Sequence, residues 1–139
     1  MAVPESQRAD NLYNKIVKAR DLAVHTIKIT QNERYFPLEY RTALTNDIIS
    51  KAKDIFVHAF TANEIKVDDN PEEWKERRRL QVTAVRECNE LMALISIAKK
   101  TYHLRGKKVR HWIKLTKAAR ADLATWKTSD RKRYRHLEQ

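Results

Sequence analysis

Turn-forming residues are scarce in this sequence. Its 139 residues include one glycine, Gly106, and three prolines. The strands of a sheet are connected by turns, and turns are rich in glycine and proline. This chain therefore has few residues suited to connecting strands. Charged residues make up 34% and apolar residues 42% of the chain, a balance that suits long amphipathic helices. The sequence therefore predicts an all-α fold, and its length suits a single domain over residues 1–139.

Apolar periodicity predicts four helices. Apolar residues recur at spacings of three and four, which place them on one helix face, over about residues 10–31, 38–65, 71–102 and 107–127. Long helices with short connections favour antiparallel neighbours, so the expected architecture is an antiparallel up-down four-helix bundle. The last residues, about 128–139, are expected to form a basic C-terminal tail, with one further turn capped by Ser129 as an alternative.

Three boundaries carry their own signals. Pro37 removes a backbone donor and disfavours helix at the residue before it, which separates the first helix from the second. Asn70, Pro71 and Glu73 form a start signal for the third helix, with Asn70 as its N-cap and Pro71 at its first position. Gly106 is expected to end that helix in the left-handed conformation.

The same spacing predicts which residues face the core. They are Leu12, Tyr13, Ile16, Val17, Ala23, Val24 and Ile27 in the first helix, Leu44, Ile48, Ile55, Phe56, Ala59 and Phe60 in the second, and Trp74, Val85, Cys88, Leu91, Met92 and Ile95 in the third. Cys88 is the one cysteine of the chain, so it cannot form an intramolecular disulfide. Its place on an apolar face favours a buried thiol over a catalytic one.

Membrane insertion and export are not expected. No apolar run approaches the roughly 18 residues that a membrane span needs. The opening MAVPESQRAD lacks the apolar segment of a signal peptide, and a single cysteine fits a reducing compartment. We therefore expect a cytoplasmic protein that does not bind membranes.

Motifs for catalysis are missing from the sequence. One glycine cannot supply a phosphate-binding loop, and neither the HExxH motif nor the Glu-x-x-His pairs of di-iron bundles occur. Glu87 and Glu90 are expected to be exposed helix residues and not an acid pair. The sequence predicts no catalytic residue, no metal ligand and no cofactor.

Two Asp-x-x-x-His pairs are the strongest candidates for a metal site. Asp21 and His25 form one pair, and Asp54 and His58 form the other. A spacing of four places both members of a pair on one helix face. A site with two His and two Asp ligands is one interpretation. A local carboxylate–imidazole hydrogen bond within each pair is favoured.

Positive charge is confined to the second half of the chain. Residues 1–69 hold ten Lys or Arg and ten Asp or Glu, whereas residues 70–139 hold nineteen basic and eight acidic residues. From Lys99 to His136 there are fourteen basic residues, and Asp122 and Asp130 are the acids among them. A surface that only needs to be soluble mixes the two signs, so this asymmetry indicates a polyanionic partner.

The fourth helix separates its charges from its apolar residues. At about 100° per residue, Lys107, Arg110, Lys114 and Lys117 cluster within about 80° on one side. The other side carries Val109, Trp112, Ile113, Thr116, Ala119, Leu123 and Trp126. The cations repeat on a scale comparable with the spacing of phosphates, which favours a nucleic acid over a merely solvated face. The predicted nucleic-acid-binding residues are Lys99, Lys100, Arg105, Lys107, Lys108, Arg110, Lys114, Lys117, Arg120, Arg131, Lys132, Arg133 and Arg135.

Part of the second helix resembles a known family. The stretch FPLEYRTALTNDIISKAKDIFVHAFTANEI, residues 36–65, is similar to the signature of the four-helix-bundle family that includes ribosomal-RNA intervening-sequence proteins. The matching residues are Phe36, Pro37, Glu39, Leu44, Thr45, Ala52 and Asn63. The segments AVPESQR, WKERRRLQVTAVRECNELMALI and WKTSDRKRYRHL resemble the accessory variability proteins of diversity-generating retroelements. Together these stretches cover most of the chain.

The resemblance implies a specific role. Such accessory proteins are small basic barrels built from five copies of a four-helix bundle. They partner a reverse transcriptase and bind its template RNA, which supports mutagenic cDNA synthesis without catalysis by the accessory protein itself. The resemblance thus implies a homopentamer whose partners are a reverse transcriptase and RNA or an RNA–cDNA hybrid.

Two other functions remain open at the level of sequence. One is a stand-alone protein that binds structured RNA, as intervening-sequence proteins are expected to do, without a polymerase partner. The other is a helical module that binds an acidic protein. The neighbouring genes would separate these alternatives.

Overall fold

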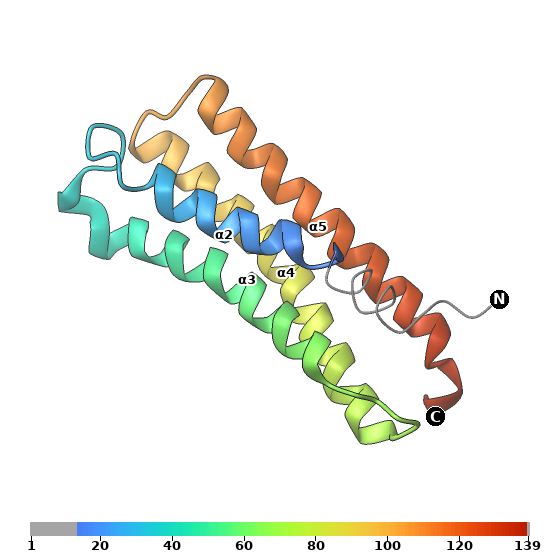
Figure 1. Ribbon diagram of the computed structural model, residues 1–139. Coiled ribbons are helices and arrows are strands. Elements are labelled where there is room, and N and C mark those ends of the chain that lie inside the picture. The colour runs from blue at the N-terminus through green and yellow to red at the C-terminus, as the bar shows by residue number, and fades with distance from the viewer. Residues whose placement is uncertain (1–13, 139) are drawn as a thin grey trace.

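Four helices pack around one core in the computed structural model, which describes residues 14–138 (Figure 1). With the labels of Figure 1, they are α2 (Val17–Ile29), α3 (Asn46–Glu64), α4 (Pro71–Thr101) and α5 (Lys107–Arg133). Two short elements lie between α2 and α3, the 3₁₀ turn η1 (Leu38–Tyr40) and the π turn η2 (Arg41–Thr45), and the 3₁₀ turn η3 (Arg135–Leu137) follows α5. Residues 14–138 contain no strand, so the all-α prediction is confirmed.

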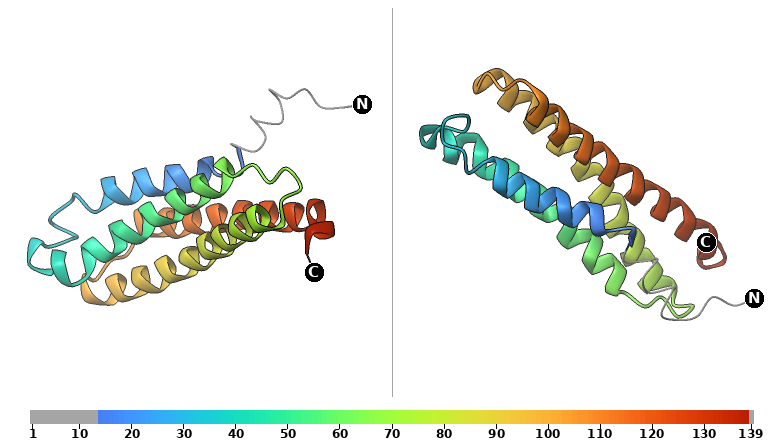
Figure 2. Two further views of the ribbon diagram at one scale, coloured as in Figure 1. Left: turned by 90° about the horizontal axis from the view of Figure 1, so that it is seen from below. Right: turned by 45° about the horizontal axis from the view of Figure 1, so that its top comes forward.

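Each helix contacts two others. Helices α2 and α4 each pack against both α3 and α5. The 30–37 and 102–106 connections lie close together at one end of the molecule, where both line the same pocket. The connection after α3 lies at the other end beside the C-terminal residues, where His136 Nε2 is 3.2 Å from Asp69 Oδ1 (Figure 2). No helix within residues 14–138 is both long enough and apolar enough to cross a membrane.

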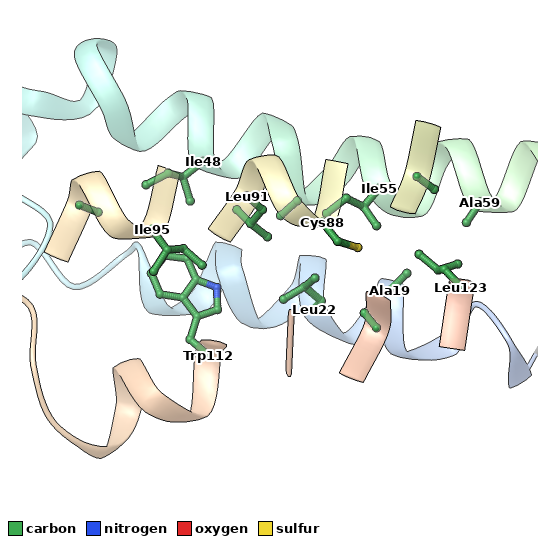
Figure 3. Close-up of a cluster of buried hydrophobic side chains, with 14 of the residues drawn as sticks. Ala19, Leu22, Ile48, Ile55, Ala59, Cys88, Leu91, Ile95, Trp112 and Leu123 are labelled. Carbon is green, nitrogen blue, oxygen red and sulfur yellow. The ribbon is translucent and has the colours of Figure 1, made fainter. Parts of the chain in front are cut away.

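The core receives side chains from all four helices (Figure 3). Leu22 of α2, Ile55 of α3, Leu91 of α4 and Trp112 of α5 are completely buried. The Trp112 indole N–H donates to the Thr26 hydroxyl at 2.9 Å, so the one polar atom of this large buried ring is satisfied. This interior joins the four helices through buried apolar contacts.

The predicted core faces are confirmed in part. Phe60, Val24 and Ile27 were expected to face inward but are 43%, 44% and 38% exposed. Leu22 of α2 lies in the core instead. Helix α2 carries apolar residues on more than one side, and its contacts with α3 and α5 determine which of these residues are buried. The predicted start of the first helix, with Leu12 and Tyr13, lies outside the described residues.

The N-terminus of α4 forms as predicted. The Asn70 side-chain oxygen accepts hydrogen bonds from the N–H groups of Glu72 at 3.0 Å and Glu73 at 3.4 Å. Pro71 follows at the first helical position, where a missing N–H has no cost. The expected helix over about 38–65 begins differently, as η1 and η2 precede α3. In the wide turn of η2, the Thr45 hydroxyl is buried and lies 2.9 Å from the Tyr102 hydroxyl.

The prediction for Gly106 was wrong in its detail. Helix α4 ends at Thr101, and the left-handed residue after it is His103, with φ of 56°. The N–H of the following residue, Leu104, donates back to the Lys99 carbonyl at 3.1 Å, as in a Schellman motif. Gly106 is instead the N-cap of α5, with φ of 98° and ψ of −172°, a conformation that is essentially restricted to glycine.

Candidate nucleic-acid interface

Helix α5 presents an apolar face to the core and a basic face to solvent. Val109, Trp112, Thr116, Ala119, Leu123 and Trp126 are buried and Ile113 is partly buried, as the sequence predicts. The ladder residues, defined here as Lys107, Arg110, Lys114 and Lys117, are all exposed. Within the described chain no acidic side chain forms an ion pair with any of them. Their charges are therefore available to an external anion.

The basic residues divide between the two ends of α5. The helix has 27 residues, which corresponds to about 40 Å. The ladder residues lie in its first turns, and the same face becomes basic again at Lys132. Between them, Ala121, Thr125 and Thr128 are exposed and uncharged. The predicted site thus forms two clusters along one helix.

The remaining predicted residues extend these two clusters. Lys99 and Lys100 lie in the last turn of α4, and Arg105 lies in the connection to α5, so all three are near the N-terminal end of α5. Exposed basic residues at the other end are Arg131, Lys132, Arg133 and Arg135. Arg120 differs from the rest, because it is half-buried and donates to Asn89 Oδ1 of α4 at 2.8 Å.

A buried ion pair fixes the C-terminal end of α5. Asp130 is completely buried, and Arg77 of α4 donates from Nε to its Oδ2 at 2.8 Å. Gln81 donates to the same oxygen at 2.7 Å, and Arg77 also donates to the Ile65 carbonyl at 3.1 Å. The Arg77 guanidinium lies 5.2 Å from the centre of the Trp126 ring. This cluster extends α5 to Arg133, so the prediction of a tail from about 128 was wrong for its first residues.

The last described residues are also attached to the bundle. Glu138 accepts a hydrogen bond from the Trp74 indole at 3.3 Å and forms an ion pair with Arg78 at 3.0 Å. The Trp74 ring packs 5.0 Å from that of Tyr134, measured between centroids. Nothing local in the sequence signals these contacts, because each partner is far away along the chain. They hold the C-terminal basic cluster in a defined place beside α4.

The local pairing expected for the two Asp-x-x-x-His pairs does not occur. Asp21 bonds to Arg20, and the His25 ring packs edge-on to that of His111 with 5.3 Å between centroids. His58 Nδ1 bonds to Glu87 of α4 instead of Asp54. Across residues 14–138, no group of three His, Cys, Asp or Glu side chains is placed to hold a metal ion.

Glu87 was expected to be exposed and is buried. Its burial raises the pKa of the Glu87 carboxyl, and the bond to His58 opposes this shift in part. Glu90 remains largely accessible and pairs with Lys51 at 2.7 Å. Cys88 is completely buried, and burial raises the pKa of its thiol to about 12, as expected for a thiol that is not reactive.

No family model, curated protein or solved structure matches this chain. The resemblance to accessory variability proteins therefore stays a prediction, and the functional argument rests on the geometry and charge of α5.

Proposed function

We propose that this protein is a non-catalytic RNA-binding accessory protein of a diversity-generating retroelement, which binds template RNA and the reverse transcriptase that copies it. The observation that carries the RNA-binding part is the ladder on α5, which is exposed and forms no ion pair with any residue from 14 to 138. The polymerase partner is proposed from the sequence resemblance alone.

The arrangement of the charges favours a nucleic acid over an acidic protein. An RNA strand offers phosphates at regular intervals over a long distance, and the cations of α5 and its flanks are spread over a helix of about 40 Å. When lysine and arginine side chains contact phosphates, counterions condensed on the nucleic acid are released. This release supplies most of the affinity of sequence-independent binding. Such contacts position the RNA without selecting a base sequence.

The proposal includes the architecture and assembly that the resemblance implies. Helices that contact their sequence neighbours, with connections at alternate ends, support an antiparallel up-down bundle. Exposed apolar residues support contacts between copies, since Leu38 is 56% and Ile97 is 52% exposed. Leu115, a third candidate for such contacts, packs partly against the core. A homopentamer is the expected assembly, and light scattering that reports a monomer at micromolar concentration would refute it.

The RNA-binding proposal is tested by comparing two double variants with equal charge loss. Lys114→Ala with Lys117→Ala removes half of the ladder, whereas Lys53→Ala with Lys66→Ala removes two exposed lysines on or beside α3. Fluorescence anisotropy with a labelled single-stranded RNA should show a clear loss of affinity for the ladder variant and a small one for the control. Equal losses would mean that only net charge matters and would contradict a site on α5.

The polymerase partner has a separate test. A retroelement accessory gene is expected to lie beside a reverse-transcriptase gene and a pair of near-identical repeats. The neighbouring reverse transcriptase, purified with this protein, should elute with it from a sizing column at low micromolar concentration. A gene neighbourhood without a polymerase would leave a stand-alone RNA-binding protein as the better proposal.

A further inference from the structure

A pocket of about 820 Å³ opens at the end of the molecule where α5 begins. Its walls come from the last turns of α2, the 30–37 connection and residues 102–109. Small-molecule sites typically have volumes of about 300–1,000 Å³, so the pocket is large enough for a nucleotide. It lies beside the ladder and includes residues from the first turn of α5, Lys108 and Val109.

The pocket is lined by cations. Lys28, Arg34, Arg105 and Lys108 contribute to its walls, together with two histidines. None of its lining residues in the described chain is acidic. Arg105 and Lys108 are exposed and have no ion-pair partner among residues 14–138, so neither charge is neutralised by the protein. A phosphate group would satisfy both.

Tyr35 gives the pocket an accessible aromatic ring. The next residue, Phe36, is 1% exposed and packs edge-on against Tyr102 and Trp112, which anchors the connection to the core. Tyr35 is 46% exposed, and the guanidinium of Arg34 lies 5.7 Å from the centre of its ring. An exposed tyrosine on an anchored backbone is a suitable surface for stacking an unpaired base.

His25 adds a polar atom that lacks a partner. Its Nε2 is buried and makes no hydrogen bond within the described chain, although the residue lines the pocket. Burial, followed by the nearby His111 and Lys28, lowers the pKa of His25, so its ring is neutral near pH 7. Buried polar atoms are rarely left unsatisfied in folded proteins.

We infer that this pocket binds one unpaired nucleotide of an RNA strand, with the base against the Tyr35 ring and the phosphate between Arg105 and Lys108. This inference rests on the proposed function, because Arg105 and Lys108 belong to the same basic cluster as the ladder. The ladder then holds the backbone that leads away from the pocket. Unpaired RNA bases are commonly recognised by such stacking.

Mononucleotide binding tests the pocket independently of long RNA. Adenosine 5′-monophosphate should bind the wild-type protein in isothermal titration calorimetry, whereas adenosine and inorganic phosphate should each bind more weakly. Tyr35→Ala should weaken this binding by about 5- to 150-fold, the effect typical of a lost base–aromatic contact. Phe60→Ala is the matched control, because it removes another exposed ring, on α3. It should leave binding unchanged.

The phosphate contacts have a matched control as well. Arg105→Ala with Lys108→Ala should abolish the preference for the monophosphate over adenosine, while Lys53→Ala with Lys66→Ala should retain it. All four residues are exposed, so thermal melting should confirm that both double variants stay folded.

The outcomes separate this inference from the proposed function. If long RNA binds but the monophosphate does not, or if Tyr35→Ala and Phe60→Ala behave alike, the pocket inference is overturned and the proposed function stands. If the monophosphate binds at Tyr35 but long RNA does not bind at all, the pocket is a free-nucleotide site and the proposed function is wrong.

Discussion

Arg77 and Asp130 form the one ion pair within residues 14–138 whose side chains are both buried, at 5% and 1% exposure. Removing two charges from water is costly, and the pair offsets that cost only while both partners remain. Gln81 adds a second hydrogen bond to Asp130 Oδ2, and the Ile65 carbonyl accepts one from Arg77. Loss of one partner would leave the other as an unpaired charge in the core.

Asp130→Ala should therefore destabilise the protein by about 3–5 kcal/mol. Asp122→Ala is the control, because Asp122 pairs with Lys18 at the surface and such pairs contribute about 0–1 kcal/mol. Chemical denaturation followed by circular dichroism measures both free energies of unfolding. Similar small losses in the two variants would show that the Arg77–Asp130 pair does not hold the end of α5.

Glu87 should make stability depend on pH. Its pKa is raised in the folded protein from an ordinary value of 4.5, mainly by burial, with His58, Asp54 and Lys51 as the charged neighbours. The folded state then holds this proton more tightly than the unfolded state does. The contribution of Glu87 to stability is therefore largest below pH 4.5 and is lost as the pH rises through the raised pKa.

Glu87→Gln removes this titration. The free energy of unfolding of the variant, relative to that of the wild type, should increase as the pH rises above 4.5. Urea denaturation at several pH values measures the difference. A difference that stays constant with pH would contradict a raised pKa for Glu87.

At the level of elements, local signals were sufficient for some features and long-range contacts decided others. The cap at Asn70 and the inward face around Trp112 were predictable, because both depend on residues within a few turns. The true end of α5 was not, because Asp130 is held by Arg77 on another helix. The apolar face of α2 was ambiguous for the same reason: packing excludes Val24 and Ile27 from the core.

The start of α5 depends on the backbone of Gly106. A side chain there would meet no atom within 4 Å, so a substitution acts through φ of 98° alone. Gly106→Ala should cost about 1–3 kcal/mol, the range for a residue held in a sparsely populated backbone region. Lys107→Ala, one residue later at an exposed position, should change stability by less than about 0.5 kcal/mol. Equal melting temperatures for the two variants would contradict backbone strain from a side chain at residue 106.

At the scale of the whole molecule, net charge is distributed unevenly between the two halves of the chain. Residues 1–69 have no net charge, and residues 70–139 carry the formal excess of +11. The candidate site could be predicted as a set of basic residues, since charge and periodicity are visible in the sequence. The pocket beside Tyr35 could not be predicted, because it depends on the 30–37 connection meeting residues 102–109.

The salt dependence of RNA binding tests the central claim most directly. Each phosphate neutralised on a single strand should contribute about −0.7 to the slope of log Kobs against log salt concentration. If the four ladder residues all contact phosphates, the wild-type slope should be about −3 or steeper. Lys114→Ala with Lys117→Ala should reduce the magnitude of the slope by about 1.4, and Lys53→Ala with Lys66→Ala should leave it unchanged. A flat salt dependence, or equal slopes in all three proteins, would contradict RNA binding by the basic face of α5.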